Sequence, residues 1–252
     1  MPPDPRLRFS DRVAEYVLAR PRYPDALVPL LRERLGLESD WTVADIGAGT
    51  GFSAEPFLRN GNAVIGIEPN PAMRAAAHAL YPPETGLSLR EGEAERTGLD
   101  DASVDLVVAG QAFHWFDRAR AGAEFSRILK PPRPVALFWN SRRTGSDPFL
   151  IAYERLLVDF GTDYGSVRHD RLNPDEWRAF FTAGHEYHTL PNEQRLDRAG
   201  LRARLLSSSY VPAKDQPRAQ EMLERLDEIF DAHEEDGRVR ILYDTEIHLG
   251  RV

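Results

Sequence analysis

The chain has 252 residues, of which 42% are hydrophobic and 29% charged, and its net charge is −8. These values are typical of a globular protein with a buried core, and an acidic chain is poorly suited to bind nucleic acid or anionic lipid through bulk charge. The absence of cysteine excludes disulfides, thiolate metal sites and a cysteine nucleophile. The histidines show no metal-binding spacing, so we expect no metal site. Without a membrane-length apolar run or a secretory signal, the expected location is the cytoplasm.

Two helices are predicted at the start of the chain. Residues 10–20 place apolar side chains at helical spacing, with Ser10 as a cap and Pro21 after the end. A second helix is predicted over 25–35, with Gly36 just past its end. We expect residues 1–36 to form a helical lid.

Five short apolar segments follow and are predicted as buried strands, at 42–46, 63–67, 87–91, 104–109 and 134–139. Helical segments separate them, at 54–59, 71–80 and 118–129. This alternation is typical of the doubly wound α/β class, in which helices cover both faces of a mostly parallel sheet. Because no stretch is long enough for an interdomain linker, we expect a single domain over 1–252, with 37–145 as its ligand-binding core.

The last hundred residues follow a different pattern. Helices are predicted over 148–160, 174–181 and 197–206, and from a cap at Asp215 to Gly237; strands are predicted over 184–196 and 238–249. Two late strands separated by helices suggest an antiparallel addition to the sheet. We expect the helices of 146–252 to cover the site.

The most informative segment is VADIGAGTGF, residues 43–52, in which a predicted strand runs into a glycine turn that opens a helix. Backbone N–H groups in such a turn favour a nucleotide-like ligand. The dinucleotide fingerprint requires its third glycine where Phe52 stands, whereas the third glycine here is Gly51, and this difference disfavours NAD. The alternative is a tight turn without a ligand.

A second candidate is Glu68, which ends the second predicted strand 21 residues after Gly47. A carboxylate at this place can accept both hydroxyls of a ribose, although a lone strand-end glutamate is otherwise a solvated surface residue. We expect it to support no core, so that its removal would leave the fold intact. The segments 92–95 and 110–117 follow the next two strands, and ligands of open α/β sheets bind at such carboxyl ends.

These segments resemble the class I S-adenosylmethionine-dependent methyltransferases, in particular the small-molecule branch that includes trans-aconitate methyltransferase-like proteins. The resemblance covers nearly the whole chain and is carried by VADIGAGTG, GIEPNPAM, GEAERTGLDDASVDLVVAGQAFHWFD and FSDRVAEYVLARPRYP. It implies a seven-stranded Rossmann-like sheet with an antiparallel last strand, S-adenosylmethionine as cofactor, and methyl transfer to a small molecule, with carboxylate and hydroxyl oxygens as candidate acceptors. It also implies cofactor contacts from Asp45, Gly47, Ala48, Gly49, Gly51, Glu68, Pro69, Glu93, Ala94 and Gln111. Glu93 stands where we expect an aspartate.

On the substrate side, His114 is the candidate catalytic residue, because a histidine can exchange a proton near neutral pH. Alternatively it lines the pocket between Phe113 and Trp115, and an ionised carboxylate acceptor would need no base. Tyr16 and Arg20 share one face of the first predicted helix. They are predicted to form a lid over the cofactor carboxylate or an anionic acceptor, unless Arg20 reaches solvent past the helix end.

Further predicted pocket residues lie late in the chain. Trp139 and Asn140 end the fifth predicted strand and are expected to face the same mouth, and Ser209 and Tyr210 follow a cover helix. Among competing functions, an NAD-dependent oxidoreductase is disfavoured because the chain lacks a Ser–Tyr–Lys-type catalytic set. The net charge disfavours a nucleic-acid methyltransferase. A cofactor-binding protein without turnover stays open, as does the oligomeric state.

Overall fold

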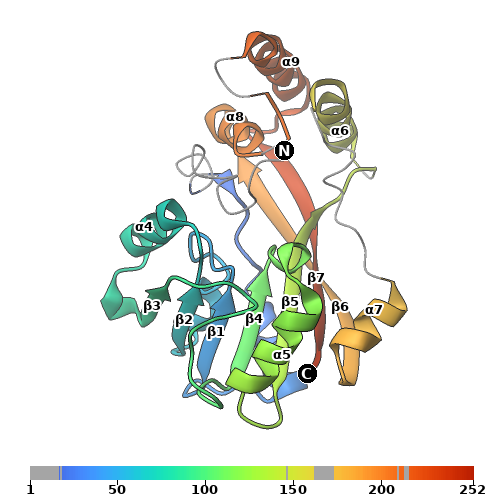
Figure 1. Ribbon diagram of the computed structural model, residues 1–252. Coiled ribbons are helices and arrows are strands. Elements are labelled where there is room, and N and C mark those ends of the chain that lie inside the picture. The colour runs from blue at the N-terminus through green and yellow to red at the C-terminus, as the bar shows by residue number, and fades with distance from the viewer. Residues whose placement is uncertain (1–16, 18, 146, 162–172, 209, 213–215) are drawn as a thin grey trace.

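The computed structural model describes residues 17, 19–145, 147–161, 173–208, 210–212 and 216–252. Seven strands form one sheet in the order β3-β2-β1-β4-β5-β7-β6 (Figure 1). Strands β1 to β5 pair in parallel, whereas β7 pairs antiparallel with both β5 and β6. The predicted seven-stranded, mostly parallel sheet with an antiparallel last strand is therefore confirmed.

The strands and helices keep close to the predicted bounds. The strands are β1 (Thr42–Ile46), β2 (Ala63–Ile67), β3 (Leu87–Arg90), β4 (Leu106–Gly110), β5 (Pro134–Arg142), β6 (Ala183–Leu196) and β7 (Val239–Arg251). The helices are α2 (Leu27–Leu35), α3 (Glu55–Arg59), α4 (Pro71–Leu80), α5 (Arg118–Ile128), α6 (Pro148–Phe160), α7 (Pro174–Phe180), α8 (Arg198–Leu206) and α9 (Pro217–His233), with short 3₁₀ turns η3 (Pro83–Thr85) and η4 (Phe113–Trp115).

Side-chain caps explain where several helices begin. Asn70, Asp117, Asp147 and Asp197 each accept backbone N–H groups from the first turn of α4, α5, α6 and α8. The predicted cap Asp215 lies outside the described residues, and α9 begins at Pro217 without a side-chain cap. Most of the predicted first helix, 10–20, also lies outside them.

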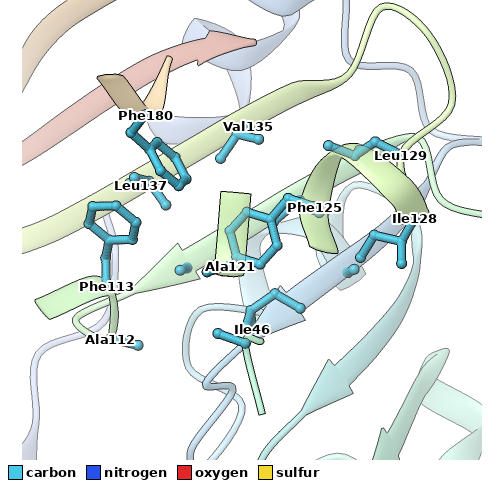
Figure 2. Packing of buried hydrophobic residues seen from close by; sticks show 14 of the residues in the cluster. Ile46, Ala112, Phe113, Ala121, Phe125, Ile128, Leu129, Val135, Leu137 and Phe180 are labelled. Carbon is cyan, nitrogen blue, oxygen red and sulfur yellow. The ribbon is translucent and has the colours of Figure 1, made fainter. Parts of the chain in front are cut away.

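Three hydrophobic clusters hold these elements together. Neighbouring residues of β4 belong to two different clusters on opposite faces of the sheet. Val107 lies in the cluster under α5, and Val108 lies in the cluster under α2 and α3. Figure 2 shows the first of these, in which Phe125 of α5 packs over the strands in one cluster with Leu137 and Phe113. Burial on both faces explains why the parallel strands have continuous apolar sequences.

The third cluster joins α6, α8 and α9 to the ends of β6 and β7. Strands β5, β6 and β7 have 9, 14 and 13 residues against four or five in β1 to β4, and they extend beyond the parallel core toward these helices (Figure 1). The long strands therefore connect the parallel core to the helical cover. Of the helices in the described ranges, none is long and apolar enough to cross a membrane.

Candidate functional site

The site begins at the glycine turn after β1. The backbone φ angles of Gly47, Gly49 and Gly51 are 71°, 56° and 86°, a left-handed conformation that favours glycine. The N–H groups of Gly47 and Ala48 donate to the carbonyl of Ile67 at 2.8 and 3.1 Å. These bonds hold the turn against the end of β2.

The three glycines are needed for different reasons. A Cβ on Gly47 would lie 2.7 Å from the Ala112 Cβ, and one on Gly51 would lie 2.9 Å from the Tyr81 ring, so both positions need glycine for packing. A Cβ on Gly49 would meet nothing closer than a backbone oxygen at 4.0 Å. Gly49 therefore borders open space, which is what a turn that cradles a ligand requires.

Glu68 is bound directly to this turn. One carboxylate oxygen accepts the N–H of Gly49 at 2.9 Å and the other accepts the N–H of Asn70 at 2.8 Å. The side chain is 8% exposed, and burial raises its pKa against the opposing effect of both N–H groups and Arg74. Our expectation that Glu68 supports no structure is wrong, because its carboxylate joins the glycine turn to the chain after β2. Each oxygen keeps a second lone pair for a ligand donor.

Asp45 lies under the same turn and is fully buried. Its Oδ2 accepts the hydroxyl of Ser53 at 2.7 Å, whereas its Oδ1 has no hydrogen-bond partner in the described part of the chain. Burial raises the pKa of Asp45 to about 7, with the Ser53 hydrogen bond opposing the shift and the charge of Glu68 adding to it. A buried carboxylate oxygen that lacks a donor fits a ligand that brings one.

Gln111 follows β4 and has φ = 59°, an uncommon conformation for a residue with a side chain. Its N–H donates to the Phe138 carbonyl at 2.9 Å and its side-chain amide donates to the Asn140 carbonyl at 3.3 Å. Such outliers concentrate at functional sites. The conformation of Gln111 therefore agrees with the prediction that the end of β4 belongs to the site.

The remaining predicted cofactor contacts lie at the same end of the sheet. Pro69 is half-buried beside Glu68, Ala94 is 4% exposed, and Glu93 is exposed and forms a narrow turn with Arg96. The sheet order thus brings the segments after β3, β2, β1 and β4 to adjacent positions along one edge.

Two predicted pocket residues lie in an aromatic cluster of the core. Phe113 is 1% exposed and its ring centroid lies 4.6 Å from Phe180 and 5.8 Å from Trp177. Trp139 is 8% exposed and packs edge-on against Trp177 and Phe113. By contrast, His114 is half-buried and lies 4.6 Å from the ring of Trp115, which is 42% exposed. His114 and Trp115 are therefore the more accessible residues of this segment.

Asn140 is buried on the opposite face of β5 from Trp139, where its side chain forms hydrogen bonds with several segments. Its amide nitrogen donates to the Arg22 carbonyl at 3.3 Å, and its Oδ1 accepts the Thr245 hydroxyl at 2.6 Å and the Asn192 amide at 3.0 Å. The expectation that Trp139 and Asn140 face one mouth is wrong, because adjacent strand residues point to opposite faces. The strand also continues to Arg142 rather than ending here.

The segment before α2 lies between the glycine turn and α8. Arg20 is half-buried and donates to the Ser207 carbonyl at 2.9 Å, so it does not simply reach solvent. Two residues later, the Arg22 guanidinium lies 3.6 Å from the centroid of the Phe52 ring, next to Gly51. Two other predicted site residues, Tyr16 and Ser209, lie outside the described residues; Tyr210, also predicted, is half-buried beyond α8.

Two groups of buried or partly buried polar side chains were not predicted from the sequence. Arg204 of α8 and Tyr153 of α6 are 6% and 1% exposed, and His185 and His248 share a hydrogen bond of 2.9 Å beside Trp177. Arg204 could have been found, because it shares the buried face of its helix with Leu201 and Leu205. No group of acidic and histidine residues that could hold a metal ion occurs in the described ranges.

A sheet of this order, with a reversed seventh strand and a glycine turn after its first strand, is the fold of the class I methyltransferases. Residues 44–132 match the protein family described as methyltransferase domain. A solved structure from Anaeromyxobacter dehalogenans, provisionally assigned as a type II methyltransferase, superimposes with a TM-score of 0.68 at 25% identity, covering 92% of this chain and 97% of that one. The matched segment is therefore similar to a methyltransferase domain, and the sheet that contains it has a Rossmann-like fold.

Curated relatives agree with this class. Over 143 residues the chain is 38% identical to an uncharacterized methyltransferase of Mycobacterium bovis, covering 55% of this chain and 54% of that protein. Over 228 residues it is 28% identical to an uncharacterized methyltransferase-like protein of Schizosaccharomyces pombe, covering 88% and 85%. The chain thus spans about half the length of the mycobacterial relative that it matches.

Proposed function

We propose that this chain binds S-adenosylmethionine at the carboxyl ends of β1 to β4 and transfers its methyl group to a small molecule. The observation that carries the proposal is the pair of buried carboxylates at the open glycine turn, Asp45 and Glu68. A ribose offers two hydroxyl donors and the methionine portion of the cofactor offers a cationic amino group. Two carboxylates with spare acceptor capacity fit these donors.

Each residue has a distinct role in this proposal. The unused lone pairs of Glu68 accept the ribose hydroxyls while its occupied ones keep the glycine turn in place. The Oδ1 of Asp45 accepts from the amino group, and Gly49 leaves room for the methionine portion. By the resemblance, Glu93 and Ala94 meet the adenine edge, with Pro69, Gln111 and the Gly47–Ala48 backbone beside the cofactor.

When bound, the cofactor supplies a methyl group already activated by the positive sulfonium. The protein then has to align the acceptor for in-line displacement and exclude water. His114 accepts a proton if the acceptor is protonated, and otherwise lines the pocket with Trp115. Because the two segments FHWFD and RPRYP match the trans-aconitate methyltransferase-like branch, we place the chain there and include carboxylate and hydroxyl oxygens among its candidate acceptors.

We also propose that residues 1–252 work as one unit, since β7 packs with the parallel core through Ile247 and Leu249 and with the helical cover through Ile241 and Tyr243. The net charge of −8 supports a small molecule rather than a nucleic acid as the substrate.

Calorimetric titration with S-adenosylhomocysteine and with NAD tests the cofactor assignment. We expect saturable binding of the first and no comparable binding of the second. Tighter binding of NAD would overturn the assignment. Binding of S-adenosylhomocysteine without any methyl transfer across a panel of acceptors would instead favour a cofactor-binding protein without turnover.

A further inference from the structure

Arg204 is a buried arginine that no carboxylate of the described residues neutralises. The residue is 6% exposed, and within the described part of the chain its guanidinium donates to two hydroxyl groups, those of Tyr243 at 3.3 Å and Ser208 at 3.2 Å. In the described ranges, no carboxylate lies within ion-pair distance of it. Because burial of a charge is costly unless it is paired, this arginine calls for an anion.

Tyr153 presents a second donor to the same place. Its hydroxyl is buried and has no hydrogen-bond partner among the residues that the structure describes. It lies close enough to Arg204 and Arg142 for both charges to act on it, and burial raises the pKa of Tyr153 to about 12, so that it keeps its proton at neutral pH. The buried guanidinium of Arg204 and the buried hydroxyl of Tyr153 could therefore both donate to the same negatively charged acceptor.

Arg142 completes the group from the strand side. It is the register partner of Tyr243 across β5 and β7, and Tyr243 contacts Arg204. Its guanidinium lies 5.1 Å from the centroid of the Tyr153 ring and pairs with Glu154 at 2.5 Å. Arg20 donates to the Ser207 carbonyl at 2.9 Å, next to Ser208, whose hydroxyl accepts from Arg204, so Arg20 joins the same cluster.

This arginine cluster, Arg20, Arg142 and Arg204 with Tyr153, is continuous with the cofactor site. Arg142 follows Asn140 by two residues on β5, and the Asn140 carbonyl accepts the side chain of Gln111. Arg20 precedes Arg22, which covers Phe52 beside the glycine turn. Figure 1 shows β5 running from the parallel core toward α6 and α8, which carry Tyr153 and Arg204.

We propose that Arg204, Arg142 and the Tyr153 hydroxyl bind a carboxylate or phosphate group of the methyl acceptor, so that the enzyme selects anionic substrates. This inference rests on the proposed function for the identity of its ligand. The cofactor also carries a carboxylate, but Arg204 and Tyr153 belong to the helical cover rather than to the glycine turn. The acceptor is therefore the better source of the anion.

Calorimetric titration with succinate and with inorganic phosphate tests the site, each with and without saturating S-adenosylhomocysteine. The wild-type chain is expected to bind at least one of the two anions saturably. Arg204→Met should weaken that binding at least tenfold, because it removes a charged double donor. Its affinity for S-adenosylhomocysteine should stay within threefold of wild type. The control is Arg202→Met on the same helix, since Arg202 is exposed and pairs with Asp227.

Three outcomes of this titration overturn the proposal: no saturable binding of either anion, unchanged anion binding in Arg204→Met, or a parallel tenfold loss of S-adenosylhomocysteine binding. The last would assign Arg204 to the cofactor carboxylate. If the wild type binds an anion but not S-adenosylhomocysteine, the proposed function fails while the anion site stands. The two failures are therefore distinguishable.

Tyr153→Phe gives an independent variant that keeps the ring packing. We expect it to fold with an unchanged melting temperature and to weaken anion binding by roughly three- to tenfold, the effect of one neutral donor. Unchanged binding would remove Tyr153 from the site. A phenolate absorbance near 295 nm at pH 8, present in the wild type and absent in Tyr210→Phe, would show that Tyr210 neutralises the arginines and would overturn the proposal.

Discussion

Cofactor binding should release a proton from Asp45. In the ligand-free protein burial raises the pKa of this carboxyl to about 7, whereas a cationic amino group at its free oxygen would favour the ionised form. At pH 6 about nine tenths of the molecules hold the proton, so binding of S-adenosylhomocysteine should release roughly 0.9 proton per site. The affinity should fall by about tenfold per pH unit below 7, or ~30-fold between pH 8 and pH 5.5.

Calorimetry at pH 6 in two buffers of different ionisation heat measures the released proton directly. Asp45→Asn should bind ~10- to 100-fold more weakly than wild type at pH 8, because it loses a hydrogen bond to a charged group, and should show a flat pH dependence. The pKa of Glu68 is also raised, so the asparagine variant is needed to assign the proton. Asp100→Asn, at an exposed turn, is the control. A wild-type affinity that is constant from pH 5.5 to 8, without proton release, would refute the reasoning.

Three further predictions follow from the same structure. Glu68→Ala should weaken S-adenosylhomocysteine binding by roughly 30- to 100-fold and also lower the melting temperature by ~4–8 °C, since two backbone N–H groups lose their acceptor. The exposed Glu84→Ala is its control, and a wild-type melting temperature in Glu68→Ala would contradict the structural role. Gly49→Val should abolish binding measured by calorimetry, because a branched residue strains the left-handed turn and fills the space above it, and normal binding would make the turn merely structural. Burial lowers the pKa of His248 to about 4, so its contribution to stability is complete above pH 6.5 and is lost as the pH falls toward 4. His248→Phe should therefore narrow the drop in melting temperature between pH 7.5 and pH 4.5 by ~3–6 °C, and an unchanged drop would assign the acid sensitivity elsewhere.

The parallel core could be predicted closely because its strands are buried on both faces. β1 and β2 have the predicted bounds, since a continuous apolar run between turn residues leaves little freedom for a buried strand. β5 was predicted to end at Trp139, yet it continues through Asn140 to Arg142. Its polar end is held by pairing with β7, a contact between segments about a hundred residues apart that no local pattern reveals.

Those parts of the candidate site could be predicted in which a position requires one particular residue type. The glycines of the turn and the strand-end position of Glu68 follow from spacing alone. The structural role of Glu68 does not, because its donors are backbone N–H groups whose direction depends on the folded turn. Arg204 is a different case, because its place on the apolar face of α8 beside Leu201 and Leu205 already indicates burial, whereas its hydrogen-bond partners depend on the folded structure.

The left-handed backbone of Gln111 has a consequence for attempts to stabilise this chain. The hydrogen bond from its N–H to the Phe138 carbonyl would form equally well from a glycine, without the ~1 kcal/mol or more that this conformation costs a residue with a side chain. What glycine lacks is the side-chain amide that donates to the Asn140 carbonyl at the edge of the proposed cofactor site. A screen that selects variants by melting temperature alone would therefore accept Gln111→Gly and similar substitutions that remove backbone strain. Its products would be more stable but would bind the ligand less well. Selection for the rise in melting temperature that the ligand causes would preserve both stability and ligand binding.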